Sequence, residues 1–517
     1  MKTREDKNEP TVEEQDTSKY FEDIKNDRAA LRQFFTAMPK GGDLHNHLTG
    51  SAYAETYFEM AAKKEMYVDM TTGKLYKDKP EGIKVVRLSK DMDDLHNHRM
   101  ELIDKWSIRN FQPYKYPLGP DEYFFGTFGL LSALTSDIDD LAHLMRELKK
   151  RAVKENVQYL EVMASSPHVP EYCFLDEADY KKYDTDLKSY VKKGDDDKAK
   201  ALLGEIYDLI DTKATEAAAD YLEFIKQLDE KSRIDEEAWE TMTDNGKRKL
   251  LCRYQGYSSR GGEPLKVFAQ LYVVHKACLL SSDEKENLLV GCNIVAAENG
   301  EKSMLYYHLH MQMFAVLADK QNENKGEVKV NTSLHAGELT LGLTRPEHLT
   351  YHIDQAVNIA GANRIGHGVD LPFESNSNEI LKTMKKEAEV KPKVQSEVEP
   401  KVKPTGIPVE INLTSNEFIL GVKDSEHPIL LYHKAGVPII ISTDDPGILR
   451  TSLTEQYTLA TLRYGFSYPE IKEFVNNSIR YGFLGYEDKE QLKSELENLF
   501  KDFEATIREN HPQPTLI

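Results

Sequence analysis

Short apolar runs separated by long, charged, helical stretches are the feature that most restricts the fold of this chain. Strands joined by crossover helices lie parallel and are covered on both faces, so they are apolar almost throughout. Eight such strands favour a closed barrel, so we expect an α/β fold, a TIM-like (β/α)8 barrel with helical insertions. The predicted strands are Gly42–Leu48, Val157–Ser165, Leu265–Val274, Leu288–Ala296, Val328–His335, Arg364–Gly368, Pro408–Leu413 and Pro438–Thr443.

The spacing of these runs predicts a single barrel domain over residues 18–510 with two long insertions. The segments 60–156 and 168–264 are charged and helical in pattern, and we interpret them as the insertions. Residues 385–404 alternate in charge and contain prolines, which predicts a solvated, mobile loop. Residues 1–17 have many charges and no aromatic side chain, which predicts a disordered N-terminus.

The charge balance argues against some classes of partner. Lys and Arg number 67 against 87 Asp and Glu, so the net charge is −20 and a nucleic acid partner is not expected. No stretch approaches the roughly 20 apolar residues of a membrane span. The four cysteines show no paired spacing and residues 1–17 lack a signal-peptide core, so we expect a cytoplasmic protein with reduced thiols. A secreted or periplasmic location would require a signal peptide that has been removed. The sequence makes no prediction of oligomeric state.

Three His-x-His pairs are candidates for a metal site. On a strand, residues i and i+2 point to the same side, whereas on a helix they diverge. The pairs His96/His98 and His308/His310 lie in helical patterns, so we expect partly exposed helix histidines there. The pair His45/His47 ends the strand-like segment GGDLHNH and is followed by a turn. Both rings are therefore predicted at the C-terminal end of a strand, where barrel enzymes hold their chemistry.

Polar residues also follow three other predicted strands. SLHAGE places His335 and Glu338 at a strand end, and RIGHG places His367 between two glycines. ISTDDP places Asp444 and Asp445 after an apolar run. Each segment alone has a structural explanation, such as a helix cap, but several polar clusters at strand ends together predict one site. Imidazoles with a carboxylate suit Zn²⁺, while iron, cobalt and manganese stay open.

With these motifs, the chain resembles the adenosine deaminase family of the amidohydrolase superfamily. The matching segments are, in order, MPKGGDLHNHLTGS, YLEVMASSPH, SLHAGE, RIGHG and ISTDDP. The stretch from Leu453 to Leu484 is also similar to the family's C-terminal helices, and the MPKGG lead-in resembles the growth-factor branch. The resemblance implies a hydrolase that deaminates adenosine or 2′-deoxyadenosine to inosine or 2′-deoxyinosine and ammonia, in purine metabolism.

The resemblance also implies roles for individual residues. One Zn²⁺ per chain would be held by His45, His47, His335 and Asp444. Glu338 would protonate ring nitrogen N1 of a small-molecule purine nucleoside, and His367 would orient and help deprotonate the zinc-bound water. Asp445 would hydrogen-bond N7 of the purine and the incoming hydroxyl.

The sequence departs from the family pattern around the substrate. Thr49 stands where the family commonly has an aspartate that contacts the sugar. The fourth predicted strand reads GCNIVAAE, so Asn293 and Ala296 replace the usual Asp and Gly, although the N–H of Ala296 would still serve the purine. The segment NLTSN keeps Ser415 without the usual Cys-Pro pair. These changes affect the substrate more than the metal.

Three alternatives stay open at this point. Another 6-aminopurine, such as adenine, AMP or an N6-modified nucleoside, would use the same chemistry. A related amidohydrolase acting on an amide, lactone or phosphoester is less well matched. Its two-metal members need a bridging Lys or Glu on the fourth strand and another histidine nearby, whereas GCNIVAAE has no Lys or His and Glu298 lies at or beyond the strand end. A non-catalytic growth-factor-like binding protein would be expected to have lost a metal-binding residue or Glu338. All four proposed metal-binding residues and Glu338 are present.

Overall fold

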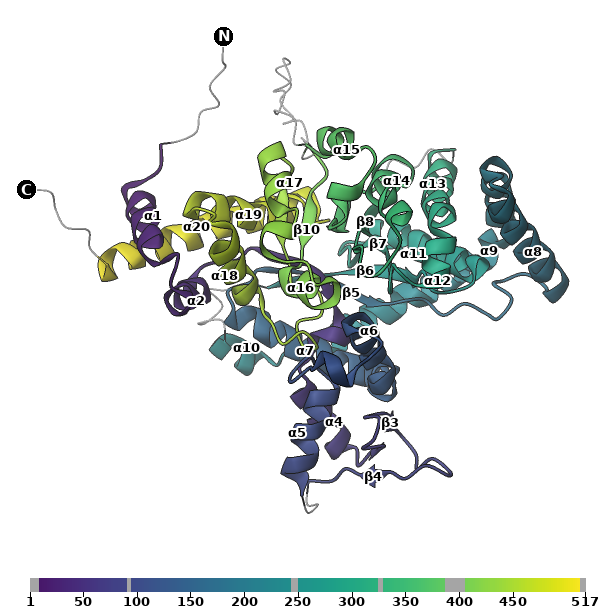
Figure 1. The fold of residues 1–517 in the computed structure, drawn as a ribbon, viewed down its shortest axis with the longest axis horizontal. Helices are drawn as coiled ribbons and strands as arrows, with labels where there is room; N and C mark the ends of the chain where they lie inside the picture. Colours follow the sequence, from purple (N-terminus) through teal and green to yellow (C-terminus); the bar gives the residue numbers. More distant parts are fainter. Residues whose placement is uncertain (1–8, 91–93, 243–249, 324–328, 386–404, 512–517) are drawn as a thin grey trace, which may run out of the picture.

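A computed structural model describes residues 9–90, 94–242, 250–323, 329–385 and 405–511. Its centre is a sheet of eight strands in the order β1-β5-β6-β7-β8-β9-β10-β11, paired in parallel throughout. Helices surround this sheet (Figure 1). The strands are β1 (Gly42–His47), β5 (Tyr159–Ser165), β6 (Leu251–Ser259), β7 (Leu289–Val295), β8 (Asn331–Ala336), β9 (Arg364–His367), β10 (Val409–Ile411) and β11 (Ile439–Ile441).

The first and last strands meet at a seam that closes the sheet. Asn46 and Asp444 form a parallel β-bridge, and the N–H of Asp444 donates to the carbonyl of His45 at 2.8 Å. Beside this bridge, the hydroxyl of Thr443 donates to the carboxylate of Asp43 at 2.5 Å. The ring of parallel strands with interleaved helices confirms the predicted TIM-like (β/α)8 barrel.

The prediction of the third strand was wrong. Residues Leu265–Val274 lie in helix α11 (Pro264–Ser282), and the strand is β6, inside the segment that we interpreted as an insertion. Helix α11 is buried on almost every side, so its sequence is apolar without a helical stripe and resembles a buried strand. Strand β6 carries Arg253, Gln255 and Ser258, because polar side chains fill this part of the barrel.

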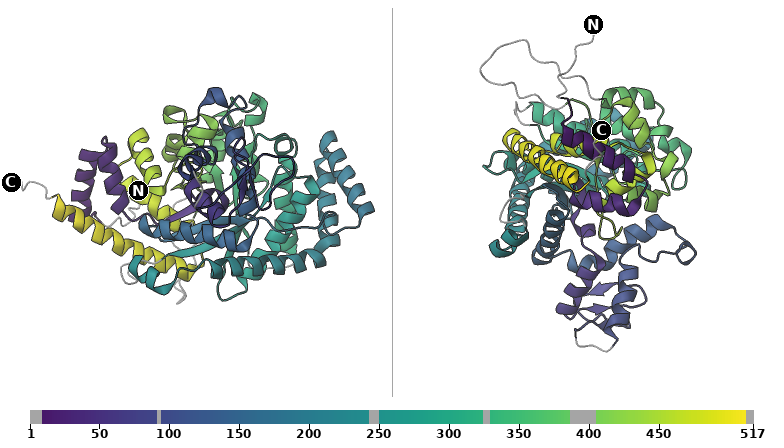
Figure 2. Two further views of the ribbon diagram at one scale, coloured as in Figure 1. Left: turned by 90° about the horizontal axis from the view of Figure 1, so that it is seen from below. Right: turned by 90° about the vertical axis from the view of Figure 1, so that its left-hand side faces the viewer.

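The first insertion is shorter than predicted. It contains the end of α4 (Ala54–Lys63), α5 (Leu95–Lys105), α6 (Pro120–Leu131) and a small sheet of β2 (Tyr67–Val68), β3 (Leu75–Tyr76) and β4 (Val86–Arg87). It projects from one end of the molecule, as the right-hand view of Figure 2 shows. Helix α7 (Ile138–Lys154), which the prediction included, connects to β5 as one of the helices of the barrel.

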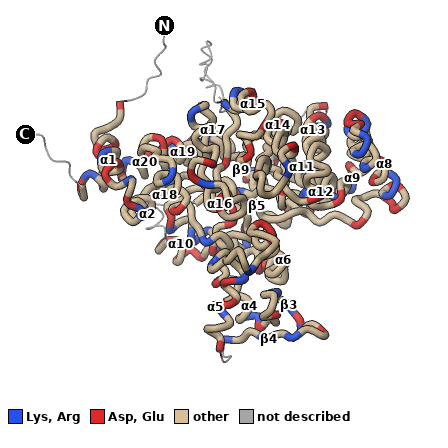
Figure 3. Tube along the Cα trace, in the orientation of Figure 1, with Lys and Arg blue, Asp and Glu red and all other residues tan. Residues whose placement is uncertain are grey.

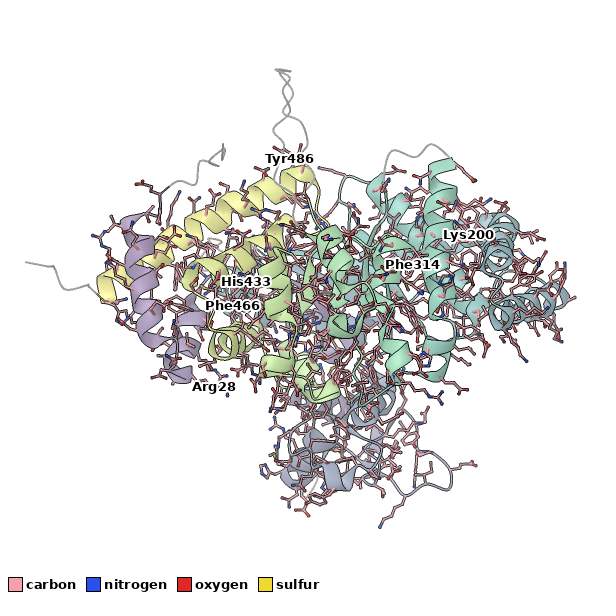
Figure 4. The ribbon with its side chains drawn as sticks, turned by 45° about the horizontal axis from the view of Figure 1, so that its top comes forward. Arg28, Lys200, Phe314, His433, Phe466 and Tyr486 are labelled. Atoms are coloured by element: carbon pink, nitrogen blue, oxygen red, sulfur yellow. The ribbon has the colours of Figure 1, made fainter. Side chains whose placement is uncertain are left out.

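The second insertion is a pair of long helices, α8 (Glu177–Lys193) and α9 (Asp196–Lys231), followed by the short α10 (Glu236–Met242). Charges of both signs lie along this pair (Figure 3). Lys200 of α9 pairs with Asp319 of the neighbouring α13 (Tyr307–Glu323) at 2.9 Å (Figure 4). Helices α8 and α9 are thus connected to the barrel through a contact of α9 with α13.

The N-terminal prediction needs correction. Helix α1 (Val12–Ile24) begins inside the segment predicted to be disordered, with Thr11 as its N-cap, and α2 (Arg28–Ala37) follows. Glu13 of α1 pairs with Arg508 of α20 (Tyr486–Asn510), so tertiary contacts stabilise a helix that its composition alone does not predict. Residues 1–8 and nearly all of the predicted loop 385–404 lie outside the described residues.

The remaining helices complete the outer layer of the barrel. Figure 4 shows one contact in this layer, where His433 of α17 lies beside Phe466 with ring centroids 5.2 Å apart. These helices are α3 (Leu48–Ser51), α12 (Glu301–Leu305), α14 (His352–Asn358), α15 (Ser377–Met384), α16 (Leu413–Leu420), α17 (Ile429–Ala435), α18 (Leu453–Tyr464) and α19 (Tyr468–Arg480). In the described part of the chain, no helix has both the length and the apolar character needed to cross a bilayer.

The seam between β1 and β11 gives a first prediction. Replacing Thr443 with Val keeps the side-chain volume but leaves the buried Asp43 carboxylate without its hydroxyl donor. Because an unsatisfied buried group costs about 1–3 kcal/mol, we expect Thr443→Val to lower the free energy of unfolding by that amount in urea titrations. Thr185→Val, on an exposed position of α8, is the control. Equal stabilities of the two variants would contradict the role of the seam.

Candidate metal centre and active site

Three histidines and one aspartate converge at the C-terminal ends of the barrel strands. Ligand atoms of His45, His47 and Asp444 all lie within 4.8 Å of one another. The Nε2 atoms of His47 and His335 are 3.2 Å apart. The Oδ1 atom of Asp444 is 3.4 Å from Nε2 of His47 and 3.6 Å from Nε2 of His45. The structure therefore brings together all four residues predicted to bind a metal.

The arrangement of these atoms fits a divalent cation. Nε2 of His45 is buried and has no hydrogen-bond partner among the described residues. A polar atom buried in this way is costly unless something binds its lone pair. Nε2 of His335, whose Nδ1 lies 3.0 Å from the amide oxygen of Asn293, likewise faces the centre and lies 3.2 Å from Nε2 of His47. Three imidazoles and a carboxylate form a donor set that suits zinc and leaves a coordination position open.

Two of the histidines are oriented by buried partners behind them. Nδ1 of His45 lies 2.7 Å from the carboxylate of Glu410, and Nδ1 of His335 lies 3.0 Å from the amide oxygen of Asn293. Such partners keep the proton on Nδ1 and direct the Nε2 lone pair toward the centre. Burial alone would raise the pKa of Glu410, but the charge of Arg364 and the hydrogen bond with His45 lower it to about 2.

Sequence reasoning missed Glu410, although a signal was present. A charged residue in the middle of the three-residue, fully buried strand β10 is exceptional, since an isolated buried charge is strongly unfavourable. Its position therefore indicates a buried partner of opposite charge or a metal ligand nearby.

Glu338 lies at the edge of the centre in a turn that a second glutamate stabilises. The carboxylate of Glu298 accepts hydrogen bonds from the backbone N–H groups of Gly337 at 3.1 Å and Glu338 at 2.9 Å. Burial raises the pKa of Glu338 well above its usual range, and the negative charges of Asp444 and Glu298 raise it further. A raised pKa favours the protonated form of this side chain, which is the form that a proton donor needs.

His367 is the last residue of β9 and has a left-handed backbone, φ +67°, and its Nε2 lies 3.7 Å from Oε1 of Glu338. Behind it, the N–H of Ile429 donates to Nδ1 of His427, whose Nε2 lies 3.0 Å from Oδ1 of Asn416. Nδ2 of Asn416 then donates to Nδ1 of His367 at 3.0 Å. This order of donors assigns the proton of neutral His367 to Nε2, which faces the centre.

A cavity of about 340 Å³ lies above the centre. The predicted site residues Thr49, Ala296 and Asp445 line it together with members of the metal set. Three aromatic residues that the sequence reasoning missed, Phe124, Phe125 and Phe128 of α6, form an apolar wall. In the described part of the chain, no Lys or Arg lines this cavity.

Two details of the cavity depend on backbone conformation. Ala296 has φ +83°, in the region that favours glycine, so the methyl group at this position is held at a cost of about 1 kcal/mol. At Gly50, an added Cβ atom would lie 1.6 Å from Oδ1 of Asp445. Position 50 therefore has to be glycine for Asp445 to occupy its place beside the metal set.

The other two His-x-His pairs lie away from the centre, on helices as predicted. His96 and His98 belong to α5, where His96 is exposed. The expectation of partial exposure is wrong for His310 of α13, which is fully buried, and burial lowers its pKa to about 3.

Comparison with known proteins shows which family the sequence of this chain resembles. The family model described as adenosine deaminase matches residues 273–499. The adenosine deaminase of Clostridium kluyveri is 27% identical over 219 residues, which cover 42% of this chain and 52% of that protein. The chain is therefore similar to the adenosine deaminase family over residues 273–499. It spans about half the length of the curated relatives that it matches.

Solved structures of similar fold cover nearly the whole chain. The N6-methyl-AMP deaminase from Arabidopsis thaliana has a TM-score of 0.52 at 19% identity and covers 91% of this chain and 99% of that one. An amidohydrolase with bound zinc from Burkholderia ambifaria has a TM-score of 0.53 at 15% identity, with coverage of 92% and 94%. These likenesses support the barrel fold.

The metal centre gives a second prediction. Asp444→Asn keeps the side-chain shape but removes the negative charge, so we expect zinc affinity, measured by competition with a chelator, to fall by more than about 10-fold. The control is His96→Ala, which removes an exposed histidine from a pair with the same spacing. Zinc binding that is unchanged in Asp444→Asn, or equally weakened in both variants, would contradict this assignment.

Proposed function

We propose that this chain is a member of the adenosine deaminase family and acts as a zinc-dependent aminohydrolase. It would remove the 6-amino group of adenosine or 2′-deoxyadenosine and release inosine or 2′-deoxyinosine and ammonia. The observation that carries the proposal is the position of Glu338, a buried acid with a raised pKa, at the rim of a His/Asp centre on the floor of a purine-sized cavity.

A zinc ion held by His45, His47, His335 and Asp444 would supply an acidified water molecule as the nucleophile at neutral pH. The protein residues would then arrange the substrate. Attack at C6 disrupts the aromatic ring and moves electron density to N1, so N1 has to gain a proton as the bond forms. Glu338 is a buried acid beside the metal set whose raised pKa favours the protonated form, and it would provide that proton.

His367 and Asp445 would position the attacking water. Because Asn416 donates to Nδ1 of His367, the Nε2–H of neutral His367 points toward the centre and would donate a hydrogen bond to the water. This arrangement favours an orienting role for His367 over that of the first proton acceptor. Asp445 is buried and lines the cavity, and its Oδ1 has no hydrogen-bond partner among the described residues, so it is free to accept one from substrate or water.

The cavity favours a neutral substrate. Its described lining has the carboxylates of Glu338, Asp444 and Asp445 and an apolar wall, without a Lys or Arg that would bind a phosphate. Moving a phosphate dianion into such a site would leave its charge unpaired, which is strongly unfavourable. We therefore propose a nucleoside rather than AMP or another nucleotide as the substrate. Thr49 at the rim would contact the sugar through a hydroxyl in place of a carboxylate.

The assignment of Glu338 gives a third prediction. Glu338→Gln removes the transferable proton without changing the size of the side chain. We expect kcat for adenosine to fall by about 10²–10⁴-fold, while zinc stoichiometry stays at one per chain. Ammonia release and metal analysis on the same sample measure both quantities. Glu347→Gln, at an exposed position, is the control, and a wild-type rate in Glu338→Gln would refute the role of proton donor.

The lining of the cavity gives a fourth prediction. We expect kcat/KM for adenosine to exceed that for AMP and N6-methyl-AMP by at least about 100-fold, since each unpaired buried charge costs several kcal/mol. A panel of adenosine, 2′-deoxyadenosine, adenine, AMP and N6-methyl-AMP, followed by ammonia or methylamine release, measures this ratio. A preference for a nucleotide would replace our substrate assignment. Stoichiometric zinc without turnover of any member would favour a growth-factor-like binding protein.

A further inference from the structure

Two metal-binding histidines are supported in different ways. Behind His45 stands a carboxylate, Glu410, whereas behind His335 stands a neutral carboxamide, Asn293. A carboxylate makes an imidazole a stronger ligand than a neutral acceptor does, because it stabilises the positive charge that develops on the ring. The difference raises the question of what determines the orientation of Asn293.

Asn293 belongs to a buried chain of hydrogen bonds inside the barrel. Its Nδ2 donates to Oε1 of Gln255 at 3.2 Å, and Nε2 of Gln255 donates to Oε1 of Glu161 at 2.8 Å. The side chains of Asn293, Gln255 and Glu161 have no exposed surface. The chain therefore connects His335 on β8 to Glu161 on β5, across two intervening strands.

The direction of this chain is determined at both ends. Glu161 pairs with Arg364 and also accepts the N–H of Phe483 at 2.8 Å, so its carboxyl oxygens act as acceptors. Gln255 must then present its NH₂ group to Glu161 and its oxygen to Asn293. At the other end, Oδ1 of Asn293 accepts the backbone N–H of Ile294 at 2.8 Å. Both ends require the same orientation of the two amides.

We propose that Asn293 and Gln255 are positioning residues that hold His335 with its proton on Nδ1, so that its Nε2 lone pair faces the metal. We call this pair the amide relay. Through the amide relay, the Arg364–Glu161 ion pair determines on which nitrogen His335 carries its proton. Neither Arg364 nor Glu161 contacts His335 directly. The inference rests on the metal site of the proposed function and assigns to it two residues beyond the ligands.

The polarity of the amide relay has a consequence for substitutions at position 293. A carboxylate there would turn one oxygen toward His335 and the other toward Oε1 of Gln255. Two acceptors would then face each other at the 3.2 Å separation of the present hydrogen bond. Asn293→Asp should therefore weaken zinc binding while Gln255 is present. In the Gln255→Met background the opposing oxygen is absent, and the same substitution should strengthen zinc binding.

The experiment measures zinc affinity of the full chain by competition with a chelator at fixed pH, together with the absorption spectrum of the cobalt-substituted protein. We expect Gln255→Met to weaken zinc binding about 10–100-fold, as other outer partners of ligand histidines do, and to change the cobalt spectrum. We expect Asn293→Asp to lower affinity alone and to raise it in the Gln255→Met background. If Gln255 had a merely structural role, the effect of Asn293→Asp on zinc affinity would not change from a decrease to an increase in the Gln255→Met background.

Gln270→Met is the matched control, because Gln270 is a buried glutamine of α11 that hydrogen-bonds Ser258 and Pro167 outside the amide relay. Unfolding of the metal-free variants shows whether each one folds, and Asn293→Ala breaks the relay at its other member if Gln255→Met is insoluble. Equal affinities of the Gln255→Met and Gln270→Met variants, or the same effect of Asn293→Asp in both backgrounds, would overturn the inference alone. A wild-type chain that binds no zinc would instead overturn the proposed metal site.

Discussion

A buried arginine inside the barrel supports the candidate metal centre. Arg364 on β9 pairs with Glu161 of β5 and with Glu410 of β10, and all three side chains are fully buried. Isolated charges of this kind would be strongly unfavourable, so each depends on the others. Glu410 continues to His45, while Glu161 continues through two amides toward His335. One ionic cluster thus connects β5, β9 and β10 and reaches two of the candidate metal ligands.

The rest of the site is built where regular structure stops. His367, Asp444 and Ala296 all have left-handed backbone conformations at the end of their strands or just after it. Such conformations cost about 1–3 kcal/mol each and persist when the surroundings impose them. Here the barrel closure imposes one of them, because Asp444 also forms the bridge between β11 and β1. The same residue therefore closes the fold and supplies a carboxylate to the centre.

Motifs at strand ends were predictable from local sequence, and elements inside the barrel were not. His45/His47 could be separated from the two helical pairs by periodicity alone, because the direction of side chains follows from secondary structure. Strand β6 was missed because its inward side chains, Arg253 and Gln255 among them, are polar and find their partners on other elements, Asp488 of α20 and Glu161 of β5. Helix α11 was mistaken for that strand because burial on almost every side removes the helical stripe from its sequence.

The sequence by itself determined which residues could form a metal centre and that they follow parallel strands, since both properties depend on residue type and short spacing. The tertiary structure decided everything that depends on distant partners: the raised pKa of Glu338, the apolar wall of α6 above the centre, and the amide chain from Asn293 to Glu161. A pKa, a cavity and a hydrogen-bond direction are each determined by groups far apart in the chain, and only folding brings those groups within a few ångströms.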